Sequence, residues 1–321
     1  NQYFRYFDVK QAEAITLGGQ LSIRWVERDV NRFMNKLLGT DNKNYVVASD
    51  TDSIYLKLDT LVEKVCKGKS TKQIVEFLNK AAEDKIQKVI DDSYQNLAHY
   101  VNAYQQKMIM KREAIANKGI WVAKKRYMMN VFDEEGVQYD IPKLKIMGVE
   151  AVKSSTPEVC RGKIKDAIRV IMNDSEDALI KFVNDFKEVF KTLSPEEVAF
   201  PRSCNNVNRY VDSNSIYKKG TPIHVKGALI YNHHINKHRL SAKYPIIKDG
   251  DKIKFLMLKQ PNTVKDTVIS FSTKIPYEFD LHKYVDYDTQ FEKTFTDPLK
   301  FILDSIGWKL EREATLEAFF G

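Results

Sequence analysis

The fold is decided by residues 45–58, which read YVVASDTDSIYLKL. Residues 45–48 are β-prone, and residues 54–58 alternate between apolar and polar side chains with the period of a strand. The polar cluster 49–53 between them is typical of a tight turn. We therefore expect a strand, a tight turn and a second strand.

Two carboxylates lie one residue apart in this turn, at Asp50 and Asp52. Alternate residues of an extended segment share a face, so the pair is expected to converge on one divalent cation. Hard oxygen ligands suit Mg²⁺, which one or two carboxylates commonly hold together with substrate phosphates. Such a site is typical of phosphoryl or nucleotidyl transfer with two metal ions. The alternative is an ordinary turn without metal, because Asp, Thr and Ser are common turn residues.

Helices are expected on both sides of this unit. Apolar residues recur at helical spacing over 11–38, which predicts a helix that ends near Gly39 although Gly18 and Gly19 interrupt the pattern. Ser70 and Gln73 resemble a capping box that starts a long helix towards Tyr100.

Residues 107–149 contain short β-prone runs, which we interpret as the second half of the same sheet; they lie at 108–110, 120–123, 127–132 and 144–147, with a turn at 133–136. Thr156 as N-cap and Pro157 at the first helical position then predict a change to helix and a domain boundary near residue 150. Further helices are expected over 157–173, 176–193, just after Ser194 and over 299–306, with a β-prone and loop-rich region at 207–285.

The chain is basic, with 51 Lys and Arg against 43 Asp and Glu in 321 residues, a net charge of +8. Residues 104–170 hold 14 basic and 8 acidic residues, so +6 of the excess falls there. A regional basic excess favours an anionic partner. The hydrophobic content of 43% excludes global disorder and suits two domains. Neither a membrane-length apolar run nor a secretory signal is visible, and a chain that opens on Asn1 rather than Met reads as part of something larger.

Cysteine and histidine residues give no metal signal. Cys66, Cys160 and Cys204 are odd in number and far apart, which favours a reducing compartment over a disulfide framework or a zinc site. The histidines at 233, 234 and 238 are expected to be solvated, in a loop or strand, without a metal.

Several motifs together resemble family B DNA polymerases. Residues 49–53 resemble the third polymerase motif of that family, and residues 124–127, Lys-Lys-Arg-Tyr, resemble the element that follows it. The stretches 1–28, 111–116, 143–148 and 153–157 are similar to the T-even bacteriophage type in particular. Ala48 and Ser49 stand where the family usually has Tyr-Gly, and we expect modest crowding there rather than loss of metal binding.

The resemblance implies an α+β fold. An antiparallel palm sheet with packed helices, completed by residues upstream or in trans, is expected over 1–150. A largely helical thumb with β-rich insertions is expected over 151–313, and a sliding-clamp-binding tail over 314–321.

The resemblance also implies roles for single residues. Asp52 matches the aspartate that bridges two Mg²⁺ ions, Asp50 its less direct partner, and Glu113 an acid that acts on metal-bound water. The residues expected to contact DNA are Lys124, Lys125, Arg126 and Tyr127 near the nascent pair, Lys153 at the start of the thumb, and Lys226 as a phosphate contact. On a strand, Lys125 and Tyr127 would share one face and Lys124 and Arg126 the other. The alternative is a solvated strand edge protected by its charges.

The implied partners are primer-template DNA, deoxynucleoside triphosphates, and an N-terminal portion that carries the exonuclease, the first palm motif with a third metal-binding aspartate, and the fingers. Without that portion we expect no primer extension, because positioning and charge neutralisation provide most of the catalysis in phosphoryl transfer. A naturally split polymerase and a truncated chain both remain open, and the implied location is the cytoplasm of the host cell.

The tail residues Leu316, Phe319 and Phe320 resemble a clamp-binding peptide that could fill an apolar groove, the alternative being that they fold back onto the thumb. A non-catalytic DNA-binding subunit is a second candidate function for the chain. A nucleotidyl cyclase with a related palm is disfavoured by the basic, thumb-like second half.

Overall fold

The computed structural model describes residues 3–149 and 153–310 and has two compact units. The first comprises Asn1–Lys118 and Asn130–Lys143, and the second Gly119–Met129 and Leu144–Gly321. No helix in the described ranges is long and apolar enough to cross a membrane.

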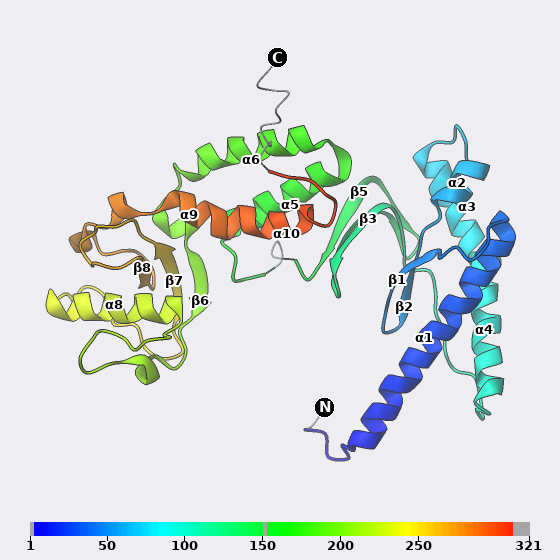
Figure 1. Ribbon diagram of the computed structural model, residues 1–321, viewed down its shortest axis with the longest axis horizontal. Coiled ribbons are helices and arrows are strands. Elements are labelled where there is room, and N and C mark those ends of the chain that lie inside the picture. The colour runs from blue at the N-terminus through cyan, green and yellow to red at the C-terminus, as the bar shows by residue number, and fades with distance from the viewer. Residues whose placement is uncertain (1–2, 150–152, 311–321) are drawn as a thin grey trace. The chain divides into compact units, whose positions relative to one another are not determined.

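A 30-residue helix, α1 (Val9–Leu38), opens the first unit (Figure 1). The Asp8 carboxylate accepts hydrogen bonds from the N–H groups of Lys10 and Gln11, and Gly39 ends the helix with a left-handed backbone (φ 65°). The predicted helix is therefore confirmed, and the two adjacent glycines do not break it.

Helices α2 (Asp59–Val65), α3 (Thr71–Ala81) and α4 (Gln87–Tyr100) complete the helical part of this unit, and a π-helical turn over Ala82–Ile86 joins the last two. The capping box predicted at Ser70 and Gln73 is present. The core of the unit is formed by one face of α1 against Tyr45, Val46, Leu61 and the inner face of α4.

The predicted strand, turn and strand are also confirmed. β1 (Val46–Asp50) pairs antiparallel with β2 (Ser53–Leu56), with a bulge between Val46 and Ala48. The Asn31 carboxamide oxygen of α1 accepts hydrogen bonds from the N–H groups of Tyr45 (2.7 Å) and Val46 (3.1 Å), which fixes the start of β1.

Strands β3 (Ala114–Ala123), β4 (Arg126–Glu134) and β5 (Val137–Met147) form a separate three-stranded sheet. The single sheet expected from the sequence is therefore two sheets in the described residues, and residues 108–110, expected as a strand, are irregular. Two-residue turns join the strands. Glu135 (φ 53°) and Gly136 (φ 90°) both have the positive φ values of a type I′ turn, and Lys125 has a positive φ (61°) at the second position of the other turn.

The second unit contains α5 (Glu158–Asn173), α6 (Glu176–Phe190) and the short α7 (Pro195–Val198). Thr156 does not cap α5, because Pro157 occupies the N-cap position and the helix begins one residue later. A three-stranded antiparallel sheet follows, formed by β6 (Phe200–Ser203), β7 (Lys252–Met257) and β8 (Val268–Phe271).

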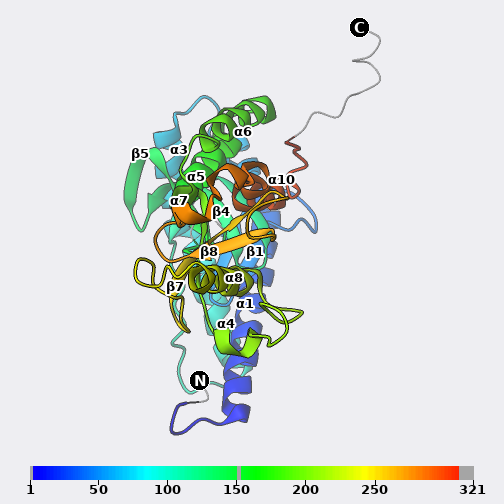
Figure 2. The same cartoon turned by 90° about the vertical axis from the view of Figure 1, so that its left-hand side faces the viewer.

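Helix α8 (Ile223–Lys237) packs against this sheet, within the region expected to be β-prone and loop-rich (Figure 2). Eight of its fifteen residues are buried, so its sequence is apolar on most faces and lacks amphipathic spacing. Gly227 permits the close approach, because a Cβ there would lie 2.5 Å from the Ser270 hydroxyl oxygen.

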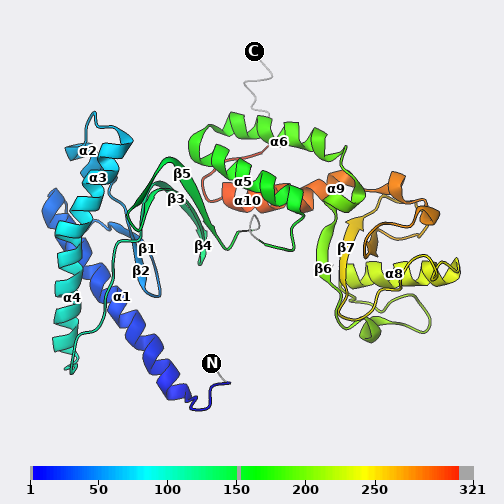
Figure 3. The same ribbon diagram turned by 180° about the vertical axis from the view of Figure 1, so that it is seen from behind.

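The last helical stretch is longer than the predicted 299–306. It comprises α9 (Tyr287–Phe291), a π-helical turn over Glu292–Thr296, and α10 (Asp297–Leu303), and Figure 3 shows α9 and α10 in sequence beside α5. Short 3₁₀ helices lie at Val207–Tyr210, Tyr277–Phe279 and His282–Tyr284. The α+β fold class is thus confirmed, while the limits of palm, thumb and tail remain predictions.

Candidate metal and nucleic-acid site

The two-residue turn between β1 and β2, formed by Thr51 and Asp52, contains an additional short-range hydrogen bond. The Asp52 N–H donates a hydrogen bond to the Asp50 carbonyl at 2.5 Å, around Thr51 with φ 50°. This is a γ-turn, and the positive φ of a β-branched residue makes it a strained one. The Thr51 hydroxyl also donates to the Asp50 carboxylate (3.0 Å), and the Ser53 hydroxyl donates to the Asp50 carbonyl (3.1 Å).

The expectation that Asp50 and Asp52 share one face of an extended segment is wrong. Asp50 is the last residue of β1 and Asp52 lies in the turn, so they do not alternate along one extended segment. Asp52 is exposed and Asp50 is half-buried. Ser49 has the extended backbone of β1 opposite Ile54, so this position does not require a glycine for its φ.

Asp52 also lies within electrostatic reach of α4. Burial raises the pKa of Tyr94, and the negative charge of Asp52 raises it further. Tyr94 is 4% exposed and belongs to the core of the first unit. The exposed turn is thus adjacent to a rigid, buried part of the protein.

Glu113 is not brought together with the two aspartates into a metal cluster. In the described part of the chain, no three His, Cys, Asp or Glu side chains are arranged to hold a metal ion. Glu113 lies just before β3, where its carbonyl accepts a hydrogen bond from the Glu135 N–H at 2.7 Å. Asp50 and Asp52 alone fit a partial ligand set of the kind that Mg²⁺ completes with water and phosphate oxygens.

The basic element 124–127 lies in the second unit. Lys124 and Lys125 form the exposed two-residue turn between β3 and β4, and only Arg126 and Tyr127 are in a strand. The expected alternation of the four side chains over two faces is therefore wrong, because the chain reverses at the lysines. Both ammonium groups extend from a hairpin tip instead, and a tip can reach the phosphates of a duplex.

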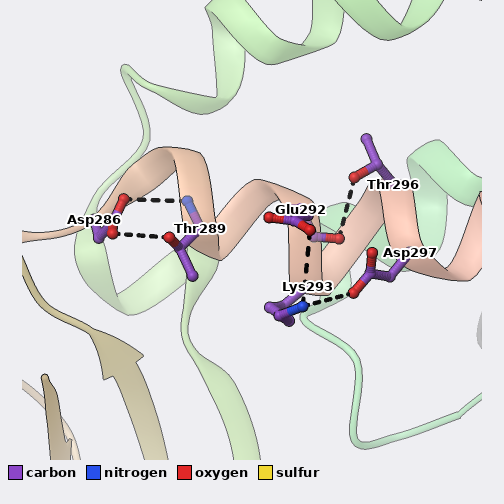
Figure 4. Close-up of polar contacts among 6 residues, drawn as sticks. All are labelled: Asp286, Thr289, Glu292, Lys293, Thr296 and Asp297. Carbon is purple, nitrogen blue, oxygen red and sulfur yellow. Dashed lines mark hydrogen bonds and ion pairs between the residues drawn. The ribbon is translucent and has the colours of Figure 1, made fainter. Parts of the chain in front are cut away.

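Arg126 has an aromatic neighbour. Its guanidinium lies 5.4 Å from the ring centre of Phe301 in α10, beside a hollow of about 300 Å³. Lys293 and Asp297 also line this hollow, and Figure 4 shows the 3.0 Å ion pair between them. A second groove, of about 650 Å³, lies beside α8 and contains none of the predicted site residues.

Three positions that support this hairpin were missed by the sequence analysis. The ring of Trp121 stacks on Tyr127, with centroids 6.0 Å apart and planes at 25°. That ring also covers Gly119, where a Cβ would lie 2.6 Å from it. Gly148 (φ 68°) lies behind the tip, and a Cβ there would be 2.4 Å from the Lys125 carbonyl oxygen. A glycine in a β-prone run is a weak signal of such a close approach.

The two lysines predicted to lie in a thumb, Lys153 and Lys226, have different surroundings. Lys153 is half-buried, and its carbonyl accepts a hydrogen bond from the Thr156 N–H. Lys226 forms a 2.7 Å ion pair with Asp266, which also accepts a hydrogen bond from the Tyr217 hydroxyl. Burial lowers the pKa of Lys226, but Asp266 and Tyr217 outweigh it, and the pKa lies above its usual value. A phosphate at Lys226 would have to compete with Asp266.

The histidine segment differs from its prediction. It lies in and just after α8, and His234 is buried at 8% exposure rather than solvated. Burial lowers the pKa of His234 to about 4, helped by the charges of His233, Lys237 and His238.

All three cysteines are free and buried, as expected without disulfides. The tail residues Leu316, Phe319 and Phe320 lie outside the described residues.

A turn with paired carboxylates and a separate basic hairpin are features of proteins that act on nucleic-acid phosphates. No protein-family model matches the chain. The chain is 34% identical over 335 aligned residues to the DNA-directed DNA polymerase of Enterobacteria phage T4, covering 100% of this chain and 37% of the relative. It is 36% identical over 334 residues to the DNA-directed DNA polymerase of Escherichia phage RB69, covering 100% of this chain and 36% of that relative.

These matches confirm the resemblance to the T-even type of phage DNA polymerase. The chain is similar over its whole length to the C-terminal part of these enzymes. It spans little more than a third of the length of the curated relatives it matches.

Proposed function

We propose that this chain is the C-terminal palm and thumb portion of a family B replicative DNA polymerase, which adds deoxynucleotides to a primer 3′ end as a template directs. The observation that carries the proposal is the similarity over the whole chain to two relatives named DNA-directed DNA polymerase. The turn at residues 50–53 and the basic hairpin would supply part of the chemical groups that this activity needs, and the rest would come from outside this chain.

The carboxylates of Asp52 and Asp50 are proposed to hold Mg²⁺ together with an aspartate outside this chain, and Glu113 to act on metal-bound water. Bound Mg²⁺ would activate the primer hydroxyl and neutralise the leaving pyrophosphate. The chain itself contributes a rigid turn, in which Asp52 is exposed to solvent and Thr51 holds the Asp50 carboxylate.

The hairpin is proposed to hold the duplex. Lys124 and Lys125 at its tip would contact phosphates, which gives the sequence-independent affinity that a polymerase requires. Arg126, Tyr127 and Lys153 would extend this surface. Lys226 would join it only by releasing Asp266.

DNA binding is the first test, and it uses the chain alone. Anisotropy of a labelled primer-template should report binding that weakens steeply between about 50 and about 200 mM salt. Lys124→Gln should reduce both the affinity and the salt dependence, whereas Lys181→Gln, at a lysine paired with Asp185 on α6, should change neither. Absence of binding by the unaltered chain would contradict the proposal.

Primer extension is the second test. The isolated chain should not extend a primer, and Mg²⁺-dependent extension without a second polypeptide would refute the need for an outside portion. Mixed with the part of the phage RB69 polymerase that precedes its match, the native chain should extend the primer. Asp52→Ala should reduce extension to background, whereas Asp41→Ala, at an exposed aspartate nine residues before Asp50, should not.

A non-catalytic DNA-binding subunit is the second candidate, although the presence of Asp50, Asp52 and Glu113 argues against a decayed polymerase. Equal extension by the native and Asp52→Ala chains in that mixture would establish it, because the chain would then only bind DNA.

The tail over 314–321 is proposed to bind a sliding clamp through Leu316, Phe319 and Phe320. Removing the residues after Thr315 should shorten the products of a clamp-dependent processivity assay. Products of unchanged length would show that the tail has no such role.

A further inference from the structure

The N-terminal half of α1 is an apolar surface with no covering element among the described residues of the first unit. Val9, Ile15, Leu17 and Leu21 are 68%, 77%, 55% and 42% exposed. The preceding turn adds Tyr3, Phe4, Tyr6 and Phe7, which are 93%, 59%, 70% and 42% exposed. Apolar patches of this kind on a protein surface commonly mark interaction sites.

The exposed stripe continues the buried one. On the C-terminal half of α1, Ile23 is buried, and Val26 belongs to the core of the first unit. Going back along the helix by four residues at a time from Ile23 leads to Gly19 and Ile15. The same helix face therefore packs on the core at one end and has no partner among the described residues of the first unit at the other, as Figures 1 and 3 show where α1 extends away from α4.

Charge distinguishes the two halves. Residues 9–22 contain only Lys10 and Glu13 as charged residues, whereas residues 23–38 contain six. A solvated helix normally carries charged residues on its exposed side, as the second half does. A net charge of zero over residues 9–22 also does not suit a nucleic-acid phosphate backbone, which requires cations.

Gly18 and Gly19 give the surface a specific shape. Each is in the helix interior, where glycine lowers helix stability, and a Cβ at either position would meet no neighbouring atom within 4 Å. The missing side chains leave the α1 backbone open to close approach, as small residues do between packed helices. No described residue of the first unit fills this opening.

We infer that this surface, residues 3–21 with its centre at Gly18 and Gly19, is the docking site for the polymerase portion that precedes this stretch in the relatives. The chain matches the C-terminal part of those enzymes, so their remaining length precedes residue 1, at the exposed end of α1. This inference rests on the proposed function, and it holds whether that portion is a separate polypeptide or part of the same chain.

The test measures association of the full chain with a defined probe, the part of the phage RB69 polymerase that precedes its match to this chain. Biolayer interferometry and light scattering should show a 1:1 complex. Gly19→Leu should weaken it by about tenfold or more, because the side chain fills the opening. Since leucine favours helix more than glycine does, unfolding of the variant cannot explain that loss.

Ile15→Glu should weaken the complex similarly, whereas Leu37→Glu, at a 52% exposed leucine near the C-terminal end of α1, should leave it unchanged. Failure of the unaltered chain to bind the probe would overturn the inference, as would equal binding by all variants. Self-association of the chain that Gly19→Leu abolishes, without binding to the probe, would assign the surface to a second copy and also overturn it. Primer-template binding, measured in parallel, reports on the proposed function independently.

Discussion

Gly148 offers a quantitative test of how the basic hairpin is held. Its φ of 68° is in the left-handed region, and a Cβ there would lie 2.4 Å from the Lys125 carbonyl oxygen and 3.0 Å from Arg126 Cγ. Cβ contacts below 3.0 Å are essentially never seen, so Gly148→Ala requires the backbone at the hairpin tip to move by at least 3.0 − 2.4 = 0.6 Å. A backbone carbonyl cannot rotate away as a flexible side chain would.

Gly148→Ala should lower the free energy of unfolding for two reasons. An alanine at a left-handed position costs about 1–2 kcal/mol, and overpacking typically adds about 1–3 kcal/mol. Gly307→Ala is the matched control, because Gly307 is in the same unit with φ 73° and a Cβ there would meet nothing within 4 Å. The free energy of unfolding of the control should therefore fall only by the cost of the left-handed backbone, without the cost of overpacking.

Urea denaturation of both variants measures this difference, and DNA binding shows its consequence. A displaced tip should no longer hold Lys124 or Lys125 against a phosphate, which reduces the slope of log affinity against log salt by about one for each lysine displaced. If the two variants lose equal stability, the close approach to Lys125 has no energetic importance. If Gly148→Ala binds primer-template with the unaltered affinity and salt slope, Gly148 does not position the tip.

Three further predictions concern stability and reactivity. The pKa of His234 falls from about 6.5 to about 4 on folding, so its contribution to the free energy of unfolding is complete above pH 6.5 and is lost towards pH 4 by about 1.4 kcal/mol per pH unit. His234→Phe should remove this part of the dependence of the free energy of unfolding on pH, measured by urea titrations at several pH values. Asp133→Asn breaks the ion pair of a 2% exposed carboxylate with Arg112 and should cost about 3–5 kcal/mol in thermal or urea unfolding, and a loss below about 1 kcal/mol would contradict this. Burial raises the pKa of Cys160 and of Cys204 to about 11, so neither thiol should react with a disulfide reagent at about pH 8 until the chain unfolds.

Local sequence was sufficient to predict those helices and strands whose capping, spacing and turn residues lie within a few residues of one another. The helix over 9–38, the capping box at Ser70 and the strand pair around residues 50–53 follow from spacing, capping and turn residues, and all are confirmed. Helix α8 was not predicted, because a helix buried on most faces has no polar side and its sequence therefore shows no helical period.

The candidate site residues could be identified from their order along the chain, but their geometry could not. Thr51 and Lys125 both adopt positive φ values, which L-amino acids with side chains rarely do, so neither reversal of the chain was expected from residue type. Alternation of side chains fails at both places, because it requires an extended backbone where the chain turns.

The sequence by itself identified the candidate residues, which are two aspartates in a turn and a run of basic residues, and the similarity to phage DNA polymerases over the whole chain. Only the tertiary structure showed that the lysines form a hairpin tip backed by Gly148, that Lys226 is paired with Asp266, and that half of α1 lacks a partner among the described residues of the first unit. The physical reason is range, because capping, turns and periodicity act between near neighbours, whereas ion pairs, close packing and exposure depend on residues that are distant in sequence.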